Sequence, residues 1–198
     1  MMLTELTVVP GASLPVQALK DHLRLGTGFT EDGMQDGLIE AYLRAAMAAV
    51  EGRIGKVLLA RQYRLTVEDW RAAGEQPLPV APVSGIVSVT VVDAANVATV
   101  LAASRYRLVP DLHRPKLASV GVLLPTVPMD GRAEVVFDAG FGTGWGQVPA
   151  DLAQAVILLA AEYYEVRQVG EGREAGLPFA VQALIERWRT VRILGGKA

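Results

Sequence analysis

Few residues in this chain are of the types that catalyse reactions or bind metals. Cysteine is absent, and His22 and His113 are the two histidines. Without cysteine the chain has no thiol nucleophile, no cysteine zinc site and no disulfide. Neither histidine has a partner at the spacing of a metal-binding helix motif, and no Gly-x-Ser-x-Gly nucleophile elbow occurs. We therefore expect structural or solvated histidines, no catalytic residues, no metal and no cofactor.

A glycine-rich segment is the most suggestive binding motif. Gly140–Gly146 reads Gly-Phe-Gly-Thr-Gly-Trp-Gly and lies between an expected strand and an expected helix. Phosphate-binding loops occupy such positions, because backbone N–H groups at a helix N-terminus attract anions. The dinucleotide fingerprint needs a glycine where Trp145 or Gln147 stands, and a P-loop needs a lysine that does not follow. We favour a connection whose Phe141 and Trp145 pack on neighbours, with small-ligand or nucleotide binding here as the alternative.

Two carboxylates form a second candidate site. Glu162 and Glu165 are three residues apart, which places both on one face of an expected helix. Glycosidase chemistry needs two carboxylates that flank a cleft, usually from separate elements. We interpret this pair as the polar edge of an otherwise apolar helix.

The charge balance argues against a DNA clamp. The chain has 19 basic and 21 acidic residues, for a formal net charge of −2. Proteins that grip the DNA backbone carry basic patches that neutralise phosphates. We therefore expect any nearby DNA to pass the protein without being gripped.

No targeting segment is evident in the sequence. The first ten residues contain Glu5 and lack a basic start followed by an apolar core. The apolar run Ala155–Ala161 is far below the roughly 20 residues of a membrane span. We expect a soluble chain that is intracellular at synthesis.

Helical periodicity marks the N-terminal part of the chain. A first helix is expected over about Leu14–Leu23, with Ser13 as its N-cap. A longer helix is expected over about Asp32–Ile54, ended by Gly55 in a left-handed turn. Its apolar stripe recurs at three- and four-residue steps and consists of Ile39, Leu43, Ala46, Val50 and Ile54.

The middle of the chain alternates with a period of two and predicts strands. Tyr63–Val67 has the pattern of a half-buried strand. Gln76–Pro82 contains three prolines and is interpreted as a connection. Ile86–Val92 and Val97–Leu101 flank a short Asp/Asn turn and predict a hairpin. Two further strands are expected at Tyr106–Leu108 and Ala133–Phe137. The β-rich insertion is expected to cover about residues 61–140.

Helical periodicity returns after Pro149. The next helix is apolar nearly all round, which is typical of burial on several sides, inside a core or between subunits. A glycine-rich break, Gly170–Gly176, precedes Pro178 and the last helix. One face of the last helix carries Val181, Leu184, Ile185, Trp188 and Val191. Arg187, Arg189 and Arg192 crowd its end, where cations suit the helix dipole, and they are either a solvated face or a contact for an acidic partner.

Four segments of the chain are Leu19–Arg24, Leu38–Gly55, Val135–Gly142 with the helix from Val148 through Glu165, and Leu177–Ile185. In this order, and spanning nearly the whole chain, they resemble the head-tail connector (adaptor) family of phages. The chain looks close to the gene transfer agent members of that family. Each segment alone is weak, but the ordered set is specific. Ile54 stands where the family often has threonine, and Gly170–Gly176 resembles a variable loop.

The resemblance implies an α+β fold, in which a helical core of about four helices carries an inserted antiparallel β-rich subdomain. Residues 1–60 are expected to form the N-terminal helical part of the core, and residues 61–147 the β-rich insertion. Residues 148–198 are expected to complete the core and supply a portal-docking arm.

The resemblance further implies a structural ring subunit and not an enzyme. The expected ring is twelvefold and lies beneath the portal. It extends the DNA channel without sequence-specific binding and supports the stopper protein. The implied location is the neck of a phage or gene transfer agent particle assembled in the bacterial cytoplasm, with no membrane contact. The family docks its last helix and C-terminal arm on the portal, which on this chain points to Phe179, Val181, Leu184, Ile185, Trp188, Arg189 and Arg192.

The residue types of the last helix agree with a docking role. Tryptophan and arginine are enriched at interface hot spots, and excess apolar helix surface needs neighbours. The apolar candidates fit equally a stripe packed on the protein's own core. Another neck or tail component, such as a stopper or tail terminator, is a third class, and those proteins are usually richer in β structure.

Overall fold

The computed structural model describes residues 1–24, 32–166 and 176–189, and the chain divides into two compact units. The sheet unit comprises Met1–Val9 and Leu59–Thr143, and the helical unit comprises Pro10–Leu58 and Gly144–Ala198. The chain therefore passes between the units three times, at 9–10, 58–59 and 143–144. The α+β class, with antiparallel sheets and four α-helices in the described part of the chain, is confirmed.

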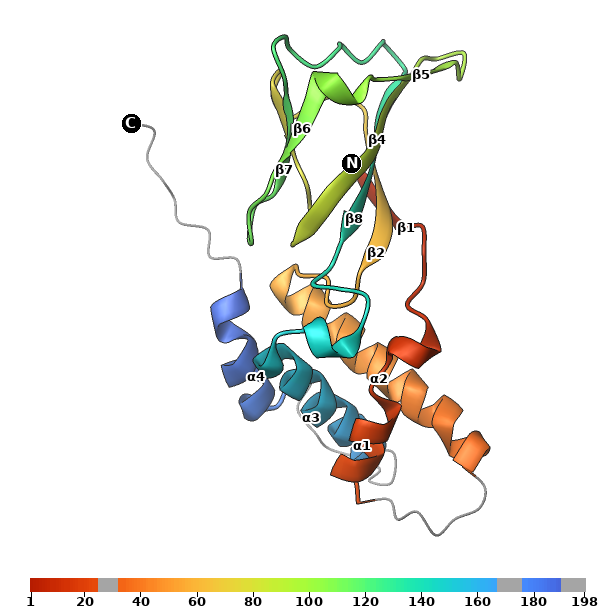
Figure 1. Cartoon of the computed structure of the whole chain (residues 1–198), viewed down its shortest axis with the longest axis vertical. Helices are drawn as coiled ribbons and strands as arrows, with labels where there is room; N and C mark the ends of the chain where they lie inside the picture. Colours follow the sequence, from red (N-terminus) through yellow and green to blue (C-terminus); the bar gives the residue numbers. More distant parts are fainter. Residues whose placement is uncertain (25–31, 167–175, 190–198) are drawn as a thin grey trace. The chain divides into compact units, whose positions relative to one another are not determined.

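The helical unit contains α1 (Val16–His22), α2 (Asp32–Ile54), α3 (Ala150–Val166) and α4 (Phe179–Ile185), with a 3₁₀ turn over Glu186–Trp188 after α4 (Figure 1). The predicted span of α2 is confirmed, and Gly55 follows it at a φ of +66°. The predicted N-cap Ser13 is wrong. It lies in a 3₁₀ turn, and Pro15 precedes α1 without a side-chain cap.

The core of the helical unit forms where α3 packs against the other helices. The predicted α2 stripe is buried over its whole length, from Ile39 to Ile54. The α3 residues buried with it are Leu152, Ala155, Val156, Ile157, Leu159, Ala160 and Ala161. Each fully buried Val, Leu or Ile side chain stabilises the fold by about 1.5–3 kcal/mol. An edge-to-face contact between the rings of Tyr42 and Tyr164, 6.1 Å apart, adds a further link between α2 and α3.

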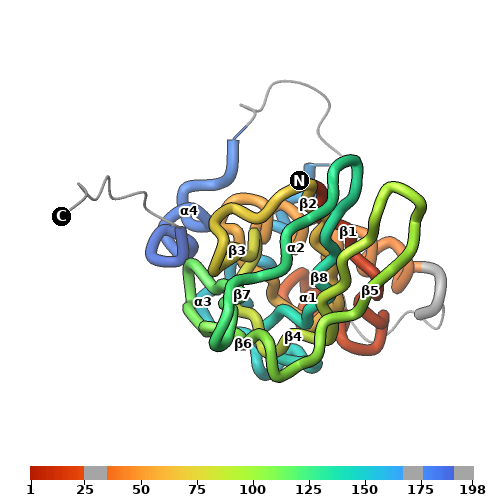
Figure 2. The backbone as a smooth tube through the Cα atoms, turned by 90° about the horizontal axis from the view of Figure 1, so that it is seen from above, coloured from red at the N-terminus to blue at the C-terminus, as the bar shows by residue number. Residues whose placement is uncertain are grey.

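The sheet unit contains two antiparallel sheets (Figures 1 and 2). The five-stranded sheet has the strand order β1 (Met2–Glu5), β2 (Arg61–Val67), β8 (Arg132–Ala139), β4 (Val83–Val92) and β5 (Ala98–Val100). The three-stranded sheet has the order β3 (Glu75–Pro77), β7 (Lys116–Ser119) and β6 (Tyr106–Val109). The predicted hairpin is confirmed as β4 and β5, with Asn96 at a φ of +62° in its turn.

Alternation of buried and exposed side chains explains the central strands. Leu65, Val135 and Val89 are cross-strand neighbours, and all three are fully buried. Tyr63 on β2 stacks on Phe137 of β8 with ring centroids 6.0 Å apart. A period of two puts such residues on one face of the sheet, where they build the core of this unit.

Three short strands differ from the sequence-based expectation. Gln76–Pro82 was expected to be a connection, but Gln76 is buried within β3, where its side-chain Oε1 accepts a hydrogen bond of 2.9 Å from the Arg71 N–H. β1 and β7 were not expected, because four residues give too short a repeat to recognise. Since β1 pairs with β2, Met1–Val9 belongs to the sheet unit, within the range 1–60 that was expected to be helical.

Candidate functional site

Gly140 is required by close backbone packing in the sheet unit. Its φ is +137°, and an added Cβ would lie 2.5 Å from the N and Cα of Ala60. The neighbouring Gly142 accepts a hydrogen bond of 2.7 Å from the Ala60 N–H. Gly140 therefore allows the close approach of two backbone segments, which explains this glycine without a ligand.

The later glycines do not lead directly into a helix. The Gly144 N–H donates to Gln147 Oε1 at 3.1 Å, and a 3₁₀ turn over Trp145–Gln147 separates this segment from α3. The first turn of α3 carries the Asp151 carboxylate. A phosphate at this helix N-terminus would meet a negative charge, so the arrangement differs from a phosphate-binding loop.

Asp151 is the centre of a side-chain cluster in the helical unit, which we call the Asp151 cluster and which consists of Asp151, Arg187 and Trp188. Asp151 Oδ2 accepts a hydrogen bond of 2.6 Å from Trp188 Nε1 and lies 2.7 Å from Arg187 Nε. The Arg187 guanidinium lies 4.9 Å from the centroid of the Trp188 ring. The cluster joins the start of α3 to the turn that follows α4. Sequence analysis missed it, because its members are far apart in the chain and only an acidic residue in a first helical turn hints at it.

The structure separates the predicted docking residues into two groups. Val181, Ile185 and Trp188 are buried within the helical unit, and Leu184 is half-buried. For the buried three, packing on the protein's own core is the arrangement observed. Phe179 is 87% exposed, and the exposed Arg189 pairs with Glu186 at 3.0 Å. Arg192, like Val191, lies outside the described residues.

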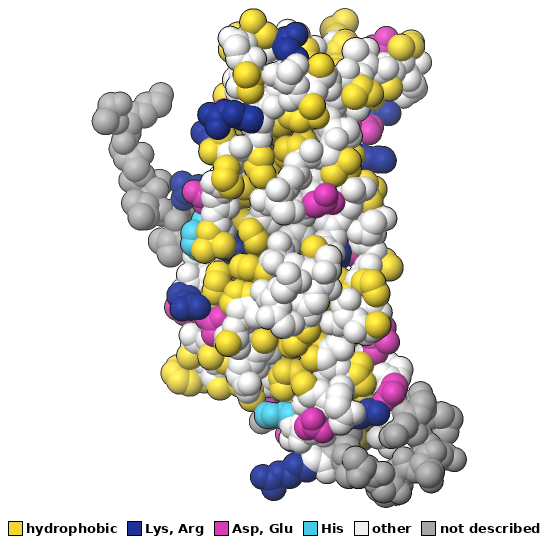
Figure 3. All heavy atoms as spheres, in the orientation of Figure 1, with side chains coloured by type: hydrophobic (Ala, Val, Ile, Leu, Met, Phe, Trp, Pro, Cys, Tyr) yellow, Lys and Arg dark blue, Asp and Glu magenta, His cyan; other side chains and the backbone are white. Residues whose placement is uncertain are grey.

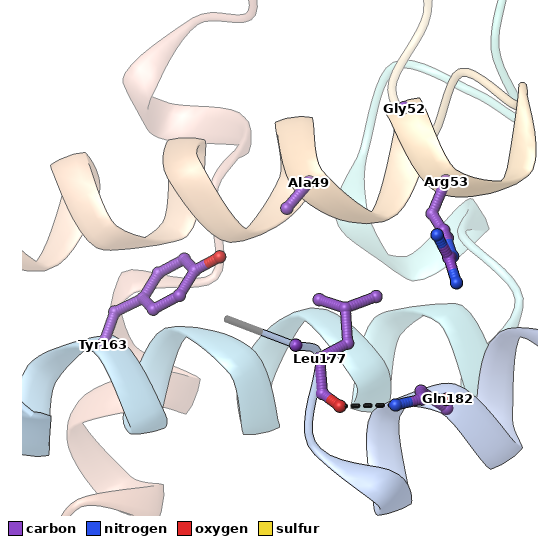
Figure 4. Close-up of a pocket in the computed structure, with 7 residues that line it drawn as sticks. Ala49, Gly52, Arg53, Tyr163, Leu177 and Gln182 are labelled. Carbon is purple, nitrogen blue, oxygen red and sulfur yellow. Dashed lines mark hydrogen bonds between the residues drawn. The ribbon is translucent and has the colours of Figure 1, made fainter. Parts of the chain in front are cut away.

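A cavity of about 600 Å³ opens among α2, α3 and the start of α4 (Figure 4). Its lining consists of Ala49, Gly52, Arg53, Tyr163, Gly176, Leu177 and Gln182. The Gln182 side chain donates a hydrogen bond of 2.6 Å to the Leu177 carbonyl across one wall. Among the described residues of this lining, the Tyr163 phenol is the one hydroxyl group, and neither a carboxylate nor a histidine is present.

The remaining candidates occupy ordinary surface positions. The His113 and Arg114 N–H groups donate to Asp111 Oδ1 at 2.6 and 2.7 Å, and these bonds hold the pKa of the Asp111 carboxyl below its usual range. His113 therefore belongs to a hydrogen-bonded turn. His22 is exposed at the end of α1. On α3, Glu162 is half-buried and Glu165 is exposed.

Residues 1–24, 32–166 and 176–189 contain neither a metal-binding cluster nor a membrane-spanning helix. Within these ranges, no three histidine, aspartate or glutamate side chains gather where they could hold a metal ion. None of the helices found there combines the length and the apolar content needed to cross a bilayer.

Comparison with known proteins gives matches among solved structures. No protein-family model and no curated protein matches the chain. A chain in the neck of an empty gene transfer agent particle, computed with C6 symmetry, is 52% identical, with a TM-score of 0.90 and full coverage of both chains. A chain in the virion of a native gene transfer agent particle is 53% identical, with a TM-score of 0.85 and 99% coverage of both. A chain in the neck of a native particle, computed with C12 symmetry, is 49% identical, with a TM-score of 0.84 and full coverage of both.

This similarity extends through both units and both termini, because at least 99% of each chain is matched. It includes the four ordered segments that sequence analysis singled out. The head-tail connector resemblance is thereby confirmed. The chain belongs to the family of neck proteins found in gene transfer agent particles.

Proposed function

We propose that this protein is a structural adaptor subunit in the neck of a gene transfer agent or related phage-like particle. In this role it forms a ring beneath the portal, supports the stopper on the other side and joins the capsid to the tail. The observation that carries the proposal is the match of 49–53% identity along the full chain to proteins of such particles, two of them from necks.

The symmetry of the relatives supports a ring of identical copies. One matching neck was computed with C12 symmetry and another with C6 symmetry. A rotationally symmetric ring requires two different surfaces on each subunit, because each copy contacts one neighbour on each side. We therefore propose a twelvefold ring for this chain in the particle neck, after assembly in the bacterial cytoplasm.

DNA passage, and not DNA binding, suits the chemistry of this chain. The formal net charge of −2 gives little attraction for phosphates. A channel wall that held DNA tightly would also hinder its exit. The proposed role needs neither a cofactor nor a catalytic residue.

The portal-docking surface is proposed to lie at the described C-terminal end. Phe179 offers an exposed aromatic ring, and Arg189 offers an exposed cation. Aromatic residues and arginine are both enriched at protein–protein interfaces. Val181, Ile185 and Trp188 support this surface from inside the helical unit, and Leu184 lies at its margin.

Deletion of the gene followed by complementation tests the proposed function. We expect the deletion strain to produce DNA-containing heads without tails, because the head lacks its connector. Complementation should restore tailed particles that contain the protein, as read by electron microscopy and immunoblotting. Normal tailed particles from the deletion strain would refute the role.

A further inference from the structure

The five-stranded sheet has two open edges, formed by β1 and β5 (Figures 1 and 2). β1 pairs only with β2, and β5 pairs only with β4, among the strands that the structure describes. An open edge leaves one row of backbone N–H and C=O groups without a strand to bind them. Such edges are templates for pairing with another chain.

Alternation along each edge strand identifies the outward-facing backbone groups. The Leu101 N–H donates to the Val89 carbonyl at 2.8 Å, so Ala98 and Val100 turn their backbone groups away from β4. On the other edge, the Leu6 N–H donates to the Gln62 carbonyl at 2.8 Å. Because the pairing alternates along the strand, the backbone groups of Leu3 and Glu5 face away from β2. Each edge therefore presents two residues with free pairing capacity.

Neither edge carries strong protection against pairing. Natural edge strands are usually blunted by lysine, proline, a bulge or a covering element. β5 reads Ala-Thr-Val, with all three residues exposed, and β1 reads Met-Leu-Thr-Glu. Hydrophobic side chains lie on the surface around the β4–β5 hairpin in Figure 3, and Val100 is 67% exposed. On the β1 edge, Met2 is 61% exposed.

The two edges lie at the same level of the sheet. The strand registers connect them through one cross-strand row, which runs Met2, Thr66, Glu134, Thr90, Val100. Residues directly opposite one another point to the same face of a sheet. Met2 and Val100 are thus the two exposed apolar ends of a single row, and four successive antiparallel steps give β1 and β5 the same direction.

We infer that these edges join neighbouring copies of this chain, so that β5 of one subunit pairs in parallel with β1 of the next. The occupant of each edge is a second copy, because two different edges of one sheet supply the two surfaces that a closed ring requires. The C12 symmetry of a neck that contains a 49% identical chain provides such neighbours. This inference rests on the proposed ring.

Cysteine pairs provide the test, because the chain has no native cysteine that would form competing disulfides. The double variant Met2→Cys/Val100→Cys is produced in the gene transfer agent host, and purified particles are oxidised and run on a non-reducing gel. We expect a ladder of dimers, trimers and larger multimers, because each copy links to two neighbours. A second pair, Thr4→Cys/Val100→Cys, tests the case in which β1 of the neighbouring copy is shifted by two residues along β5. A shift of two residues leaves the side chains on the same face of the sheet.

Matched controls separate edge pairing from chance contact. Each single-cysteine variant should run as a monomer, since a β5–β1 contact places unlike positions together. Met2→Cys/Val87→Cys should also remain monomeric, because Val87 is 50% exposed but precedes the β4 residues 90–92 that pair with β5 and is not part of either edge strand. Particles that contain either edge pair yet show no species larger than a monomer would overturn the inference. Dimers from the Val100→Cys single variant would also overturn it, because they indicate a two-fold contact.

Charge substitution gives an independent readout should a cysteine variant assemble poorly. Val100→Lys is expected to lower incorporation into particles at least tenfold, whereas Val87→Lys should leave it within twofold of the unchanged protein. Equal incorporation of both variants would refute edge pairing. Absence of the unchanged protein from wild-type particles would instead refute the proposed function.

Discussion

Asp151 links two parts of the helical unit that are 37 residues apart in the chain. Its carboxylate receives the indole N–H of the buried Trp188 and the guanidinium of Arg187. A buried donor that loses its acceptor retains the full cost of its lost hydration. The Asp151 cluster therefore stabilises the end of α4 by a polar contact as well as by apolar burial.

The first prediction concerns this cluster. Asp151→Ala should lower the free energy of unfolding by about 1–3 kcal/mol, because the Trp188 N–H is left without its acceptor. Urea unfolding followed by tryptophan fluorescence measures the change. The control Glu186→Gln, which removes an exposed pair with Arg189, should cost less than about 0.5 kcal/mol. Equal effects of the two substitutions would contradict a special role for Asp151.

Gly140 has the most constrained backbone of the glycine-rich segment. Alanine there would place a Cβ against the Ala60 backbone at a φ that favours glycine, whereas Gly146 has open space around it. We expect Gly140→Ala to destabilise the protein by about 2–3 kcal/mol and Gly146→Ala by less than about 0.5 kcal/mol. Thermal unfolding of both variants, with and without nucleotides, measures this difference. A nucleotide-dependent stabilisation lost in both variants would instead favour the ligand-binding alternative.

At the scale of the elements, long periodic segments were predictable from the sequence and short ones were not. The repeat of α2 extends over several turns, so its span emerged correctly from Ile39, Leu43 and the residues that follow. β1, β3 and β7 have three or four residues each, and their partners lie far away in the chain. Only tertiary pairing makes these segments strands.

The same limit applies to the candidate docking site. Sequence periodicity placed Val181, Ile185 and Trp188 on one helix face, and the structure shows that face buried within the helical unit. A periodic stripe specifies that a surface is covered but does not specify by what. The exposure of Phe179 also does not follow from the sequence, because the same residue type is fully buried at Phe137.

Docking through α4 is therefore best tested with point substitutions. Phe179→Ala should leave the free energy of unfolding within about 0.5 kcal/mol of its original value, because the ring is exposed. It should nevertheless weaken capture of the protein by portal-bearing heads about tenfold or more, because removal of an aromatic ring from the interface removes apolar contact area. Leu123→Ala, at a similarly exposed apolar position of the sheet unit, is the control. Equal capture of both variants would contradict docking through Phe179.

Truncation after Gly176 would be a less specific test of docking. Such a truncation removes Val181 and Ile185, which are buried in the core of the helical unit. Apolar side chains of α3 would then be exposed to solvent. Loss of capture by the truncated protein would therefore mix a folding defect with the loss of a contact.

At the scale of the whole molecule, the three chain crossings create two units from non-contiguous segments. The sheet unit needs the first nine residues as well as the central insertion, and the helical unit needs both flanking segments. Each unit presents a distinct proposed surface. The sheet unit offers open edges to neighbouring copies, and the helical unit offers Phe179 and Arg189 to the portal.

Reconstruction of the neck from purified native particles is the most direct test of the central claim. The neck should contain a ring of density that follows the fold of this chain, with twelve copies arranged beneath the portal. Mass spectrometry of the same particles should detect the protein. A neck whose ring is built by a different polypeptide, in particles that lack this chain, would contradict the proposed role.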